Sequence, residues 1–282
     1  MRRLADHGDR SPVDIHPNRH QQNTLTSDYR RIALIEIREL LKSFGTKKAI
    51  DSISLDVGEG EIFGFLGPNG AGKTTTIKIM TGVTIADHGT IHVSGLNVQT
   101  DALKAKSIMG YIPDRPYLHE LLTVREFLVF VGGLYKIPAK VALDRGLEFL
   151  SRFDMEEESE NLIEGFSHGM KQKVIMAAAL IHKPKVLIVD EPMVGLDPKS
   201  AATVKNLFKA MAKQEGTTIF LSTHTLSVVE EICTNVGIIH HGKMVASGTI
   251  SEIMTRARHR DSNLEGVFLQ ITEEEASHEE IT

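Results

Sequence analysis

The chain of 282 residues is 41% hydrophobic and 24% charged, which is the composition of an ordinary globular protein. At roughly 150 residues per domain, its length predicts two domains or one large α/β domain. Its 32 Lys and Arg residues against 37 Asp and Glu residues give a formal net charge of −5, which argues against a dedicated nucleic-acid binder. No apolar run reaches about 18 residues, so neither a membrane-spanning helix nor a signal peptide is predicted. The single cysteine, Cys233, cannot close an intrachain disulfide, which suits a reducing cytosol.

The first half of the chain is predicted to begin with strands and to continue with helices. Residues 1–31 are polar and lack apolar periodicity, so we expect a flexible N-terminal extension there. Apolar runs then predict strands at Ile32–Leu41, Ala49–Val57, Glu61–Leu66 and Thr90–Ser94. From about residue 115 to about residue 165 the apolar spacing becomes helical, and Thr123 and Glu126 have the spacing of a capping box. This stretch predicts a helical insert between β-rich segments.

The second half of the chain alternates strand and helix patterns. The continuous apolar run Val186–Val189 is typical of a buried parallel strand, and Lys199–Gln214 carries apolar side chains on one helical face. Two further strand regions are predicted at Thr217–Leu221 and at Gly237–Gly248, the second folding back on itself at its centre. For residues 251–282 we expect a short helix or strand followed by an acidic tail.

The segment Gly67-Pro-Asn-Gly-Ala-Gly-Lys-Thr74 matches the pattern of a phosphate-binding loop, Gly-x-x-x-x-Gly-Lys-(Ser/Thr). It follows a predicted strand and opens a predicted helix, which is the context that the motif requires. Glycines let consecutive backbone N–H groups point at phosphate oxygens, and the helix dipole adds to the attraction. Lys73 supplies a positive charge for the β- and γ-phosphates, and the Thr74 hydroxyl can ligate Mg²⁺. The predicted nucleotide-binding residues of this loop are Gly67, Pro68, Asn69, Gly70, Ala71, Gly72, Lys73, Thr74 and Thr75.

A pair of acidic residues, Asp190 and Glu191, ends the apolar run that begins at Val186. A carboxylate at the end of such a strand lies beside the phosphate-binding loop, where Asp190 can hold Mg²⁺ through water. Glu191, one residue further, is then placed to polarise an attacking water molecule. The loop and the acidic pair together predict hydrolysis of a nucleoside triphosphate.

A third motif, Phe166-Ser-His-Gly-Met-Lys-Gln-Lys173, precedes the apolar helical stretch Val174–Ile181. It resembles the signature sequence of ATP-binding-cassette (ABC) ATPases, usually Leu-Ser-Gly-Gly-Gln, and it lies between the P-loop and the acidic strand as in that family. Where the chain departs from the family's usual pattern, at Asp114 and at His168 and Met170, it resembles the ABC-2-type and bacterial exporter subunits of the family. Three more positions agree: Phe44 as the aromatic residue that stacks on adenine, Asp197 in Gly195-Leu-Asp197-Pro as the D-loop, and His224 as the switch histidine.

The resemblance covers about residues 32–248 and implies both a fold and a mechanism. The implied fold is α/β, with a RecA-like P-loop NTPase core, an antiparallel β subdomain and an inserted α-helical subdomain, in one ATPase domain over residues 32–250. Family members form head-to-tail homodimers or heterodimers with two ATP molecules between the subunits. Each P-loop then faces the partner's signature, here Ser167, His168, Gly169 and Met170.

The roles that the resemblance implies fall on a small set of side chains. Lys73, Glu191 and His224 would be catalytic, with His224 sensing the γ-phosphate, and Asp197 would couple the two sites. ATP and Mg²⁺ would be the cofactors, and the metal side of the site would be formed by Thr74, Asp114 and Asp190.

Two departures from the family's pattern concern these roles. The Q-loop in Gly110-Tyr-Ile-Pro-Asp114 has Asp114 where the family usually has Gln, and an aspartate is shorter, negatively charged and only an acceptor. In the signature, His168 and Met170 replace Gly and Gln. A histidine beside the partner's ATP can make activity depend on pH between about 6 and 8, a hypothesis that His168→Ala would test.

Other P-loop proteins fit the sequence less well. No Asn-Lys-x-Asp run is present, as a GTPase would need, and the interval between Gly72 and Ser167 is too short for the coiled coil of DNA-repair ABC proteins. A single cassette also differs from the paired cassettes of ABC translation factors. The sequence therefore predicts the ATPase subunit of a transporter with a separate permease, cytoplasmic and peripheral at the inner face of the plasma membrane. Residues Pro116, Tyr117 and Leu118, in the region 114–122, are the predicted permease contacts.

The alternative is a soluble ABC ATPase that acts as an assembly or regulatory factor without a permease. Both hypotheses use the same catalytic residues, so the identity of the partner separates them.

Overall fold

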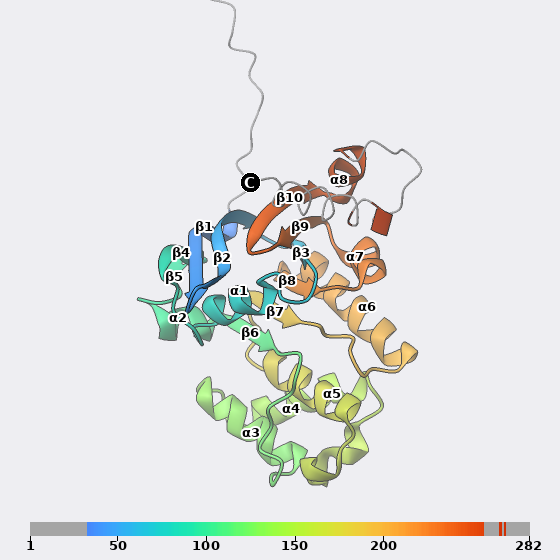
Figure 1. Ribbon diagram of the computed structural model, residues 1–282. Helices are drawn as coiled ribbons and strands as arrows, with labels where there is room; N and C mark the ends of the chain where they lie inside the picture. The colour runs from blue at the N-terminus through green and yellow to red at the C-terminus, as the bar shows by residue number, and fades with distance from the viewer. Residues whose placement is uncertain (1–32, 257–264, 267, 269–282) are drawn as a thin grey trace, which may run out of the picture. The chain divides into compact units, whose positions relative to one another are not determined.

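The computed structural model describes residues 33–256, 265, 266 and 268, so the predictions for residues 1–31 and for the acidic tail lie outside it. Its first sheet is antiparallel, with the strand order β2-β1-β4-β5. The strands of this sheet are β1 (Ala33–Phe44), β2 (Lys47–Gly58), β4 (His88–Val93) and β5 (Leu96–Asn97). They form the antiparallel β subdomain that the sequence resemblance implies (Figure 1).

The second sheet has six strands in the order β10-β9-β3-β8-β7-β6. Five of them are parallel to their neighbours, and only β10 pairs antiparallel, with β9. The strands are β3 (Ile62–Leu66), β6 (Met109–Ile112), β7 (Val186–Asp190), β8 (Thr218–Thr223), β9 (Asn235–His240) and β10 (Lys243–Thr249). The turn between β9 and β10 confirms the strand pair predicted in this region.

The order of the parallel strands brings together segments that are far apart in the sequence. Strand β8 lies between β3 and β7, and β6 lies on the other side of β7. Because parallel strands end at one edge of a sheet, the segments that follow all four strands gather there. These segments are the P-loop, residue 224, residue 191 and residues 113–114.

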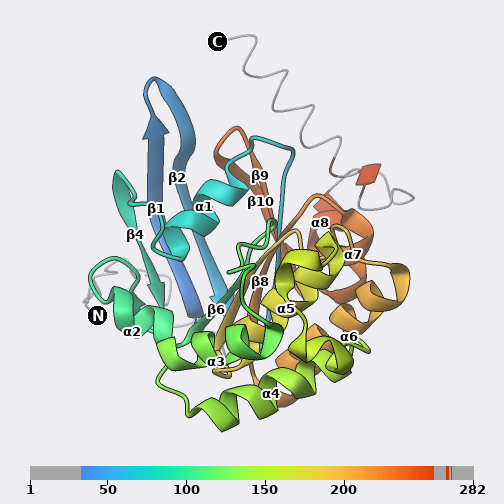
Figure 2. The same ribbon diagram turned by 90° about the horizontal axis from the view of Figure 1, so that it is seen from below.

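Alternate side chains of the central strands enter two different cores. In β7, Val186 and Ile188 pack into the cluster that includes the antiparallel sheet and α1 (Lys73–Met80). Their neighbours Leu187 and Val189 pack into the cluster that includes α6 (Pro198–Glu215) and the helical insert. Both faces of the sheet are covered, so the strand is apolar throughout. Figure 2 shows α1 between the strands of the two sheets.

The predicted helical insert forms α3 (Val124–Leu134) and α4 (Ala139–Ser151), followed by two 3₁₀ turns at Glu156–Glu160 and Ile163–Gly165. The capping box at the start of α3 is confirmed: the Thr123 hydroxyl accepts from the N–H of Glu126, whose carboxylate accepts from the N–H of Thr123. Helices α3 and α4 pack on α5 (His168–Leu180), which begins at the signature rather than after it. Figure 1 shows these helices gathered at one end of the described unit.

Three helices complete the described residues. They are α2 (Ala102–Ser107), α7 (Leu226–Ile232) and α8 (Ile250–Arg256). The sequence pattern predicts neither α2 nor α7, because both are short and depend on packing rather than on their own periodicity. In the described part of the chain, no helix combines the length and the apolar character needed to cross a bilayer.

Candidate nucleotide site

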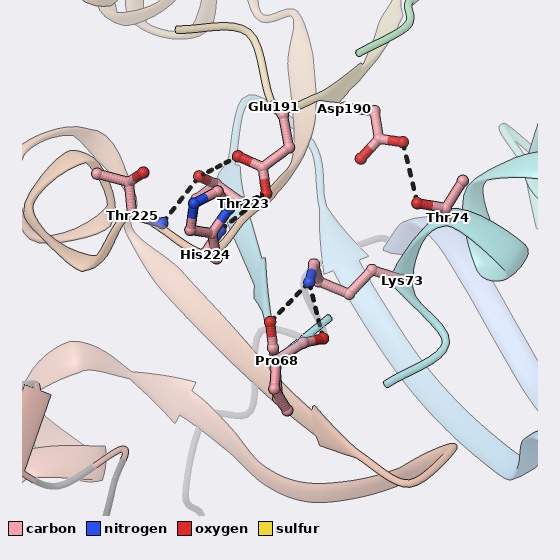
Figure 3. Close-up of polar contacts among 9 residues, drawn as sticks. Pro68, Lys73, Thr74, Asp190, Glu191, Thr223, His224 and Thr225 are labelled. Atoms are coloured by element: carbon pink, nitrogen blue, oxygen red, sulfur yellow. Dashed lines mark hydrogen bonds and ion pairs between the residues drawn. The ribbon is translucent and has the colours of Figure 1, made fainter. Parts of the chain in front are cut away.

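The P-loop connects β3 to α1 and bends around the side chain of Lys73. Gly72 has a φ of 114°, and a Cβ atom there would lie 2.5 Å from the carbonyl oxygen of Ala49, so only glycine fits. The Lys73 Nζ donates hydrogen bonds to the carbonyl oxygens of Gly67 at 2.6 Å and Pro68 at 3.1 Å (Figure 3). Burial lowers the pKa of the Lys73 ammonium, while the charges of Glu191 and Asp190 oppose this shift. The loop therefore holds a positive charge that faces two carboxylates.

Asp190, the last residue of β7, faces the first turn of α1. Its carboxylate accepts a hydrogen bond from the Thr74 hydroxyl at 3.3 Å, and its side chain is buried. Burial raises the pKa of the Asp190 carboxyl, and the hydrogen bond from Thr74 works against this change. A hydroxyl and a carboxylate at this distance are the oxygen ligands that Mg²⁺ prefers in proteins, so the two residues fit the predicted metal side of the site.

The Glu191 carboxylate is held by the end of the neighbouring strand β8. Its Oε1 accepts from the backbone N–H of His224 at 3.0 Å and contacts the His224 Nδ1 at 2.7 Å. Its Oε2 accepts from the Thr223 hydroxyl at 3.0 Å (Figure 3). The backbone of Glu191 has a φ of 47°, which is an unfavourable conformation for a residue with a side chain. Strained backbone that is fixed by several neighbours is a common feature of functional sites.

One cavity of about 350 Å³ unites these groups. Its lining includes the predicted loop residues Asn69, Gly70, Gly72, Lys73, Thr74 and Thr75, together with Phe44, Asp114, Asp190 and Glu191. Phe44 ends β1 at the cavity wall and is 56% exposed, so a flat ligand can stack on its ring. Burial, followed by the charges of Asp190 and Asp114, raises the pKa of the nearby Tyr111 to about 12. Asp114 therefore belongs to the same acidic side of the cavity as Asp190.

The signature turn lies at the N-terminus of α5 and is absent from the lining of this cavity. The Ser167 hydroxyl caps the helix by accepting from the N–H of Met170 at 3.3 Å. The His168 ring packs on Gly195, where a Cβ atom would lie 2.5 Å from its Cδ2. A Cβ atom on Gly169 would in turn lie 2.7 Å from the Gly195 carbonyl oxygen, so the signature turn and the D-loop interlock. Both Ser167 and His168 are exposed.

The D-loop is fixed by the start of α6. The Asp197 carboxylate accepts from the backbone N–H of Ser200 at 2.9 Å and from its hydroxyl at 2.5 Å. These two hydrogen bonds lower the pKa of Asp197 to about 2. Asp197 is therefore the cap of a helix, and Lys173 of the signature helix lies 3.7 Å from it.

Comparison with known proteins agrees with this geometry. The profile of the family described as ABC transporter matches residues 50–194. The linearmycin resistance ATP-binding protein LnrL of Bacillus subtilis (strain 168) is 37% identical over 79% of this chain and 71% of its own length. The bacitracin transport ATP-binding protein BcrA of Bacillus licheniformis is 37% identical over 80% of this chain and 72% of its own length. A solved structure described as the ATP-binding subunit of an ABC transporter is 30% identical, with a TM-score of 0.80, over 85% of this chain and 99% of that one.

The chain belongs to the ABC transporter family. It is accordingly an ATP-binding protein and an ATP hydrolase of the ABC type, with the P-loop NTPase fold that the sequence predicts. More distant cassettes share the fold alone, among them one described as a dimeric post-hydrolysis state of MJ0796 bound to ADP and Pi, at 22% identity and a TM-score of 0.70.

Three side chains of this ABC ATPase site have no signal in the sequence motifs. Lys47 and Ala49 of β2 line the cavity beside Phe44, and the Thr223 hydroxyl holds Glu191. Each contact depends on which strand lies beside which, and no motif spans those strands. Of these three, Lys47 has a signal in the sequence, since a lysine just after the β1–β2 turn could have predicted a further cation near a phosphate.

Proposed function

We propose that the chain is the ATP-binding and ATP-hydrolysing subunit of an ABC membrane transporter, which dimerises around two ATP molecules and drives a separate permease. One observation carries the proposal: the P-loop, the acidic strand end and the Q-loop share one cavity, while the signature turn lies outside it. The signature is therefore free to complete the cavity of another subunit. The name of the BcrA relative, a bacitracin transport ATP-binding protein, supports the same assignment.

In the proposed site, the adenine ring stacks on Phe44 and the phosphates lie along the P-loop. The backbone N–H groups at the start of α1 and the Lys73 ammonium bind the phosphate oxygens. On binding ATP, the Lys73 ammonium would replace its hydrogen bonds to the carbonyl oxygens of Gly67 and Pro68 with hydrogen bonds to phosphate oxygens. The ammonium itself would stay at the same place in the loop. Lys47, also on the cavity wall, adds a second cation.

Mg²⁺ would be held by Thr74 and Asp190, with Asp114 nearby. The observed pair of hydroxyl and carboxylate, 3.3 Å apart at the cavity wall, supports this assignment. When bound, the ion offsets the negative charge that develops on the phosphates. Asp114 is negatively charged where the family usually has a neutral Gln. The metal side of this site would therefore carry one more negative charge than is usual in the family.

Glu191 is the proposed residue that orients the attacking water. It lies on the cavity wall as a carboxylate that is 14% exposed and faces the P-loop side. His224, next to it, is the proposed γ-phosphate sensor, because its ring is 58% exposed beside the same carboxylate. For the water molecule to attack the γ-phosphate in line with the leaving oxygen, Glu191 and His224 must lie on the same side of the nucleotide.

In the proposed dimer, the turn Ser167–Met170 of one chain, in which Ser167 and His168 are exposed, meets the ATP of the other. The Ser167 hydroxyl and the free N–H groups of a helix N-terminus suit an anion. Because the D-loop interlocks with the signature turn through Gly195, movement of one is passed to the other, and Asp197 links the two sites. ATP would favour the closed dimer, and release of phosphate would reopen it.

The permease would dock on an apolar groove beside the helical insert. A cavity of about 240 Å³ is lined by side chains from the segment after α1 and from α2, β6, α3 and α5, among them Phe127, Val131 and Ile175. It continues into a second cavity of about 440 Å³ that shares Lys106 and Tyr135 with the first. Leu103 and Leu134 on its rim are 87% and 67% exposed. Of the predicted contacts, Tyr117 is exposed, whereas Leu118 packs against the core.

The test uses a tagged Glu191→Gln chain, which should bind ATP and accumulate as the dimer. It is recovered with ATP from solubilised host membranes, and the co-purified proteins are identified by mass spectrometry. A stoichiometric protein with many spanning helices supports a transporter subunit, and it should be lost when Leu134→Asp is added. The matched control Val141→Asp changes an exposed apolar residue of α4 outside the groove and should keep that protein.

Recovery of soluble proteins alone, with the chain absent from membranes, would favour the alternative function, an ABC ATPase that acts as an assembly or regulatory factor. Hydrolysis of ATP by Glu191→Gln at the wild-type rate would contradict the role of Glu191.

A further inference from the structure

The catalytic glutamate of this site is held from one side by a hydroxyl that no motif contains. Glu191 follows β7, and Thr223 ends β8, the strand beside it. The Thr223 hydroxyl donates to the Glu191 Oε2 at 3.0 Å, and the Thr223 side chain is buried. Two segments that are 32 residues apart in the chain thus meet at one carboxylate.

The direction of the Thr223 hydroxyl is fixed by a second hydrogen bond. Its oxygen accepts from the backbone N–H of Thr225 at 3.1 Å. A hydroxyl has one proton and two lone pairs, so an amide that donates to the oxygen leaves the proton for the carboxylate. The β-branched side chain of a buried threonine also has few rotamers, which further restricts the direction of the hydroxyl. The hydroxyl therefore acts as a fixed donor.

The two carboxylate oxygens of Glu191 differ in what they can still accept. Oε1 already takes two contacts from His224, one from its backbone N–H and one from Nδ1. Among the described residues, Thr223 is the only one that donates a hydrogen bond to Oε2. Since each carboxylate oxygen accepts about two hydrogen bonds, the position that remains for a water molecule is on Oε2.

We propose that Thr223 is a positioning residue for hydrolysis: its hydroxyl orients the Glu191 oxygen that receives the attacking water. This inference rests on the proposed role of Glu191 as the water-orienting carboxylate. The strained backbone of Glu191 makes such a support necessary, because a φ of 47° is not a resting conformation of a free glutamate. Its backbone N–H is tied to the Ser222 carbonyl at 2.9 Å, so β8 fixes both the main chain and the side chain.

The test compares ATP hydrolysis by the full chain with Mg²⁺ for wild type, Thr223→Val and Thr223→Ser. Valine has the shape of threonine without the hydroxyl, so kcat should fall by about tenfold while KM for ATP changes less than twofold. Serine keeps the hydroxyl and should retain at least half of the wild-type kcat. The control Thr90→Val makes the same chemical change at an exposed position in strand β4 and should hydrolyse ATP like the wild type.

A double-mutant cycle with Glu191→Gln separates positioning from a general structural effect. If Thr223 acts through Glu191, Thr223→Val should change the residual single-turnover rate of Glu191→Gln by less than twofold. An equal loss in both backgrounds, a Thr223→Val kcat within twofold of wild type, or a Thr223→Ser that is as slow as Thr223→Val would overturn the inference. Thr223→Ala, judged by the same criteria, replaces Thr223→Val if that variant does not fold.

The outcome also distinguishes this inference from the proposed function. A Glu191→Gln chain that hydrolyses ATP at the wild-type rate would remove the role of Glu191 and, with it, that of Thr223. An inactive Glu191→Gln chain together with a fully active Thr223→Val chain would overturn the Thr223 inference alone.

Discussion

The nucleotide cavity and the signature turn belong to the same ATPase, but they are built in opposite ways. In the cavity, Lys73 and Asp190 are 7% and 3% exposed, and each is hydrogen-bonded within the chain. In the signature turn, Ser167 and His168 are exposed at the start of a helix. The charged groups of the first region are paired within the chain, whereas the second presents polar groups to its surroundings.

Under the proposed function, this difference separates the groups that are paired within the chain from those that would meet a partner subunit. Buried charged groups need hydrogen-bond partners, so in the cavity Lys73 bonds to carbonyl oxygens of the loop and Asp190 to the Thr74 hydroxyl. An exposed helix N-terminus has no such requirement, and its free N–H groups remain available to an anion from outside. Changes in the cavity should therefore affect a single subunit, and changes in the signature should affect the pair.

The largest expected effect is that of Lys73→Ala on nucleotide binding. The ammonium is held in the loop by two carbonyl oxygens, so its loss removes a positive charge that is already in place. We expect the Kd for ATP with Mg²⁺ to rise at least about 100-fold, or roughly 2.8 kcal/mol, by calorimetric titration. Lys78→Ala, which removes an exposed lysine of the same helix, is the control and should bind ATP normally. Equal Kd values for Lys73→Ala and wild type would show that the cavity binds nucleotide in another way.

The second prediction concerns Ser167→Ala, which should separate binding from hydrolysis. Ser167 is outside the cavity of its own chain, so the Kd for ATP should stay within about twofold, while hydrolysis should fall by about tenfold or more. Mixing this variant with Lys73→Ala should restore activity above the sum of the two, because one intact P-loop then meets one intact signature. If both variants form ATP-dependent dimers and the mixture gains nothing, the signature acts within its own chain.

The sequence predicts the parts of this molecule that depend on neighbouring residues. The P-loop, the acidic pair and the capping box of Thr123 each lie within about ten residues, and all three form as the patterns indicate. The burial pattern of α6 follows from its apolar periodicity in the same way. Local sequence contains the glycines, caps and spacing that these features require.

The remaining features depend on contacts between distant segments. Thr223 meets Glu191 only because β8 pairs with β7, and His168 meets Gly195 only because two loops interlock. Periodicity identifies a buried strand but not its neighbour in the sheet. The helices α2 and α7 are missed for a related reason, since short helices are stabilised by what they pack against.

The smallest expected effect lies away from both regions, where the helical insert rests on the core. The His182 ring stacks on Tyr135 with centroids 3.8 Å apart, and its Nε2 lies 2.9 Å from the Met109 carbonyl oxygen. Its Nδ1 is buried and has no hydrogen-bond partner among the described residues. Burial therefore lowers the pKa of His182 below its ordinary value of 6.5, since a proton on Nδ1 would find no acceptor.

A histidine with a lowered pKa makes the folded state depend on pH in a definite direction. Below pH 6.5, His182 binds a proton in the unfolded chain but stays neutral in the folded chain until the pH reaches its lower folded pKa. The contribution of neutral His182 to the free energy of unfolding is therefore complete above pH 6.5 and is lost as the pH falls through the folded pKa. The midpoint of thermal unfolding should therefore decrease as the pH is lowered from 7.5 to 5.5. His182→Phe, which keeps the stacked ring, should reduce the slope of this midpoint against pH. His88→Phe makes the same substitution at an exposed position and is the control. An unchanged slope in His182→Phe would mean that other titrating groups account for the pH dependence of stability. Protonation of His182, at the junction between the insert and the core, would then contribute nothing to the free energy of unfolding.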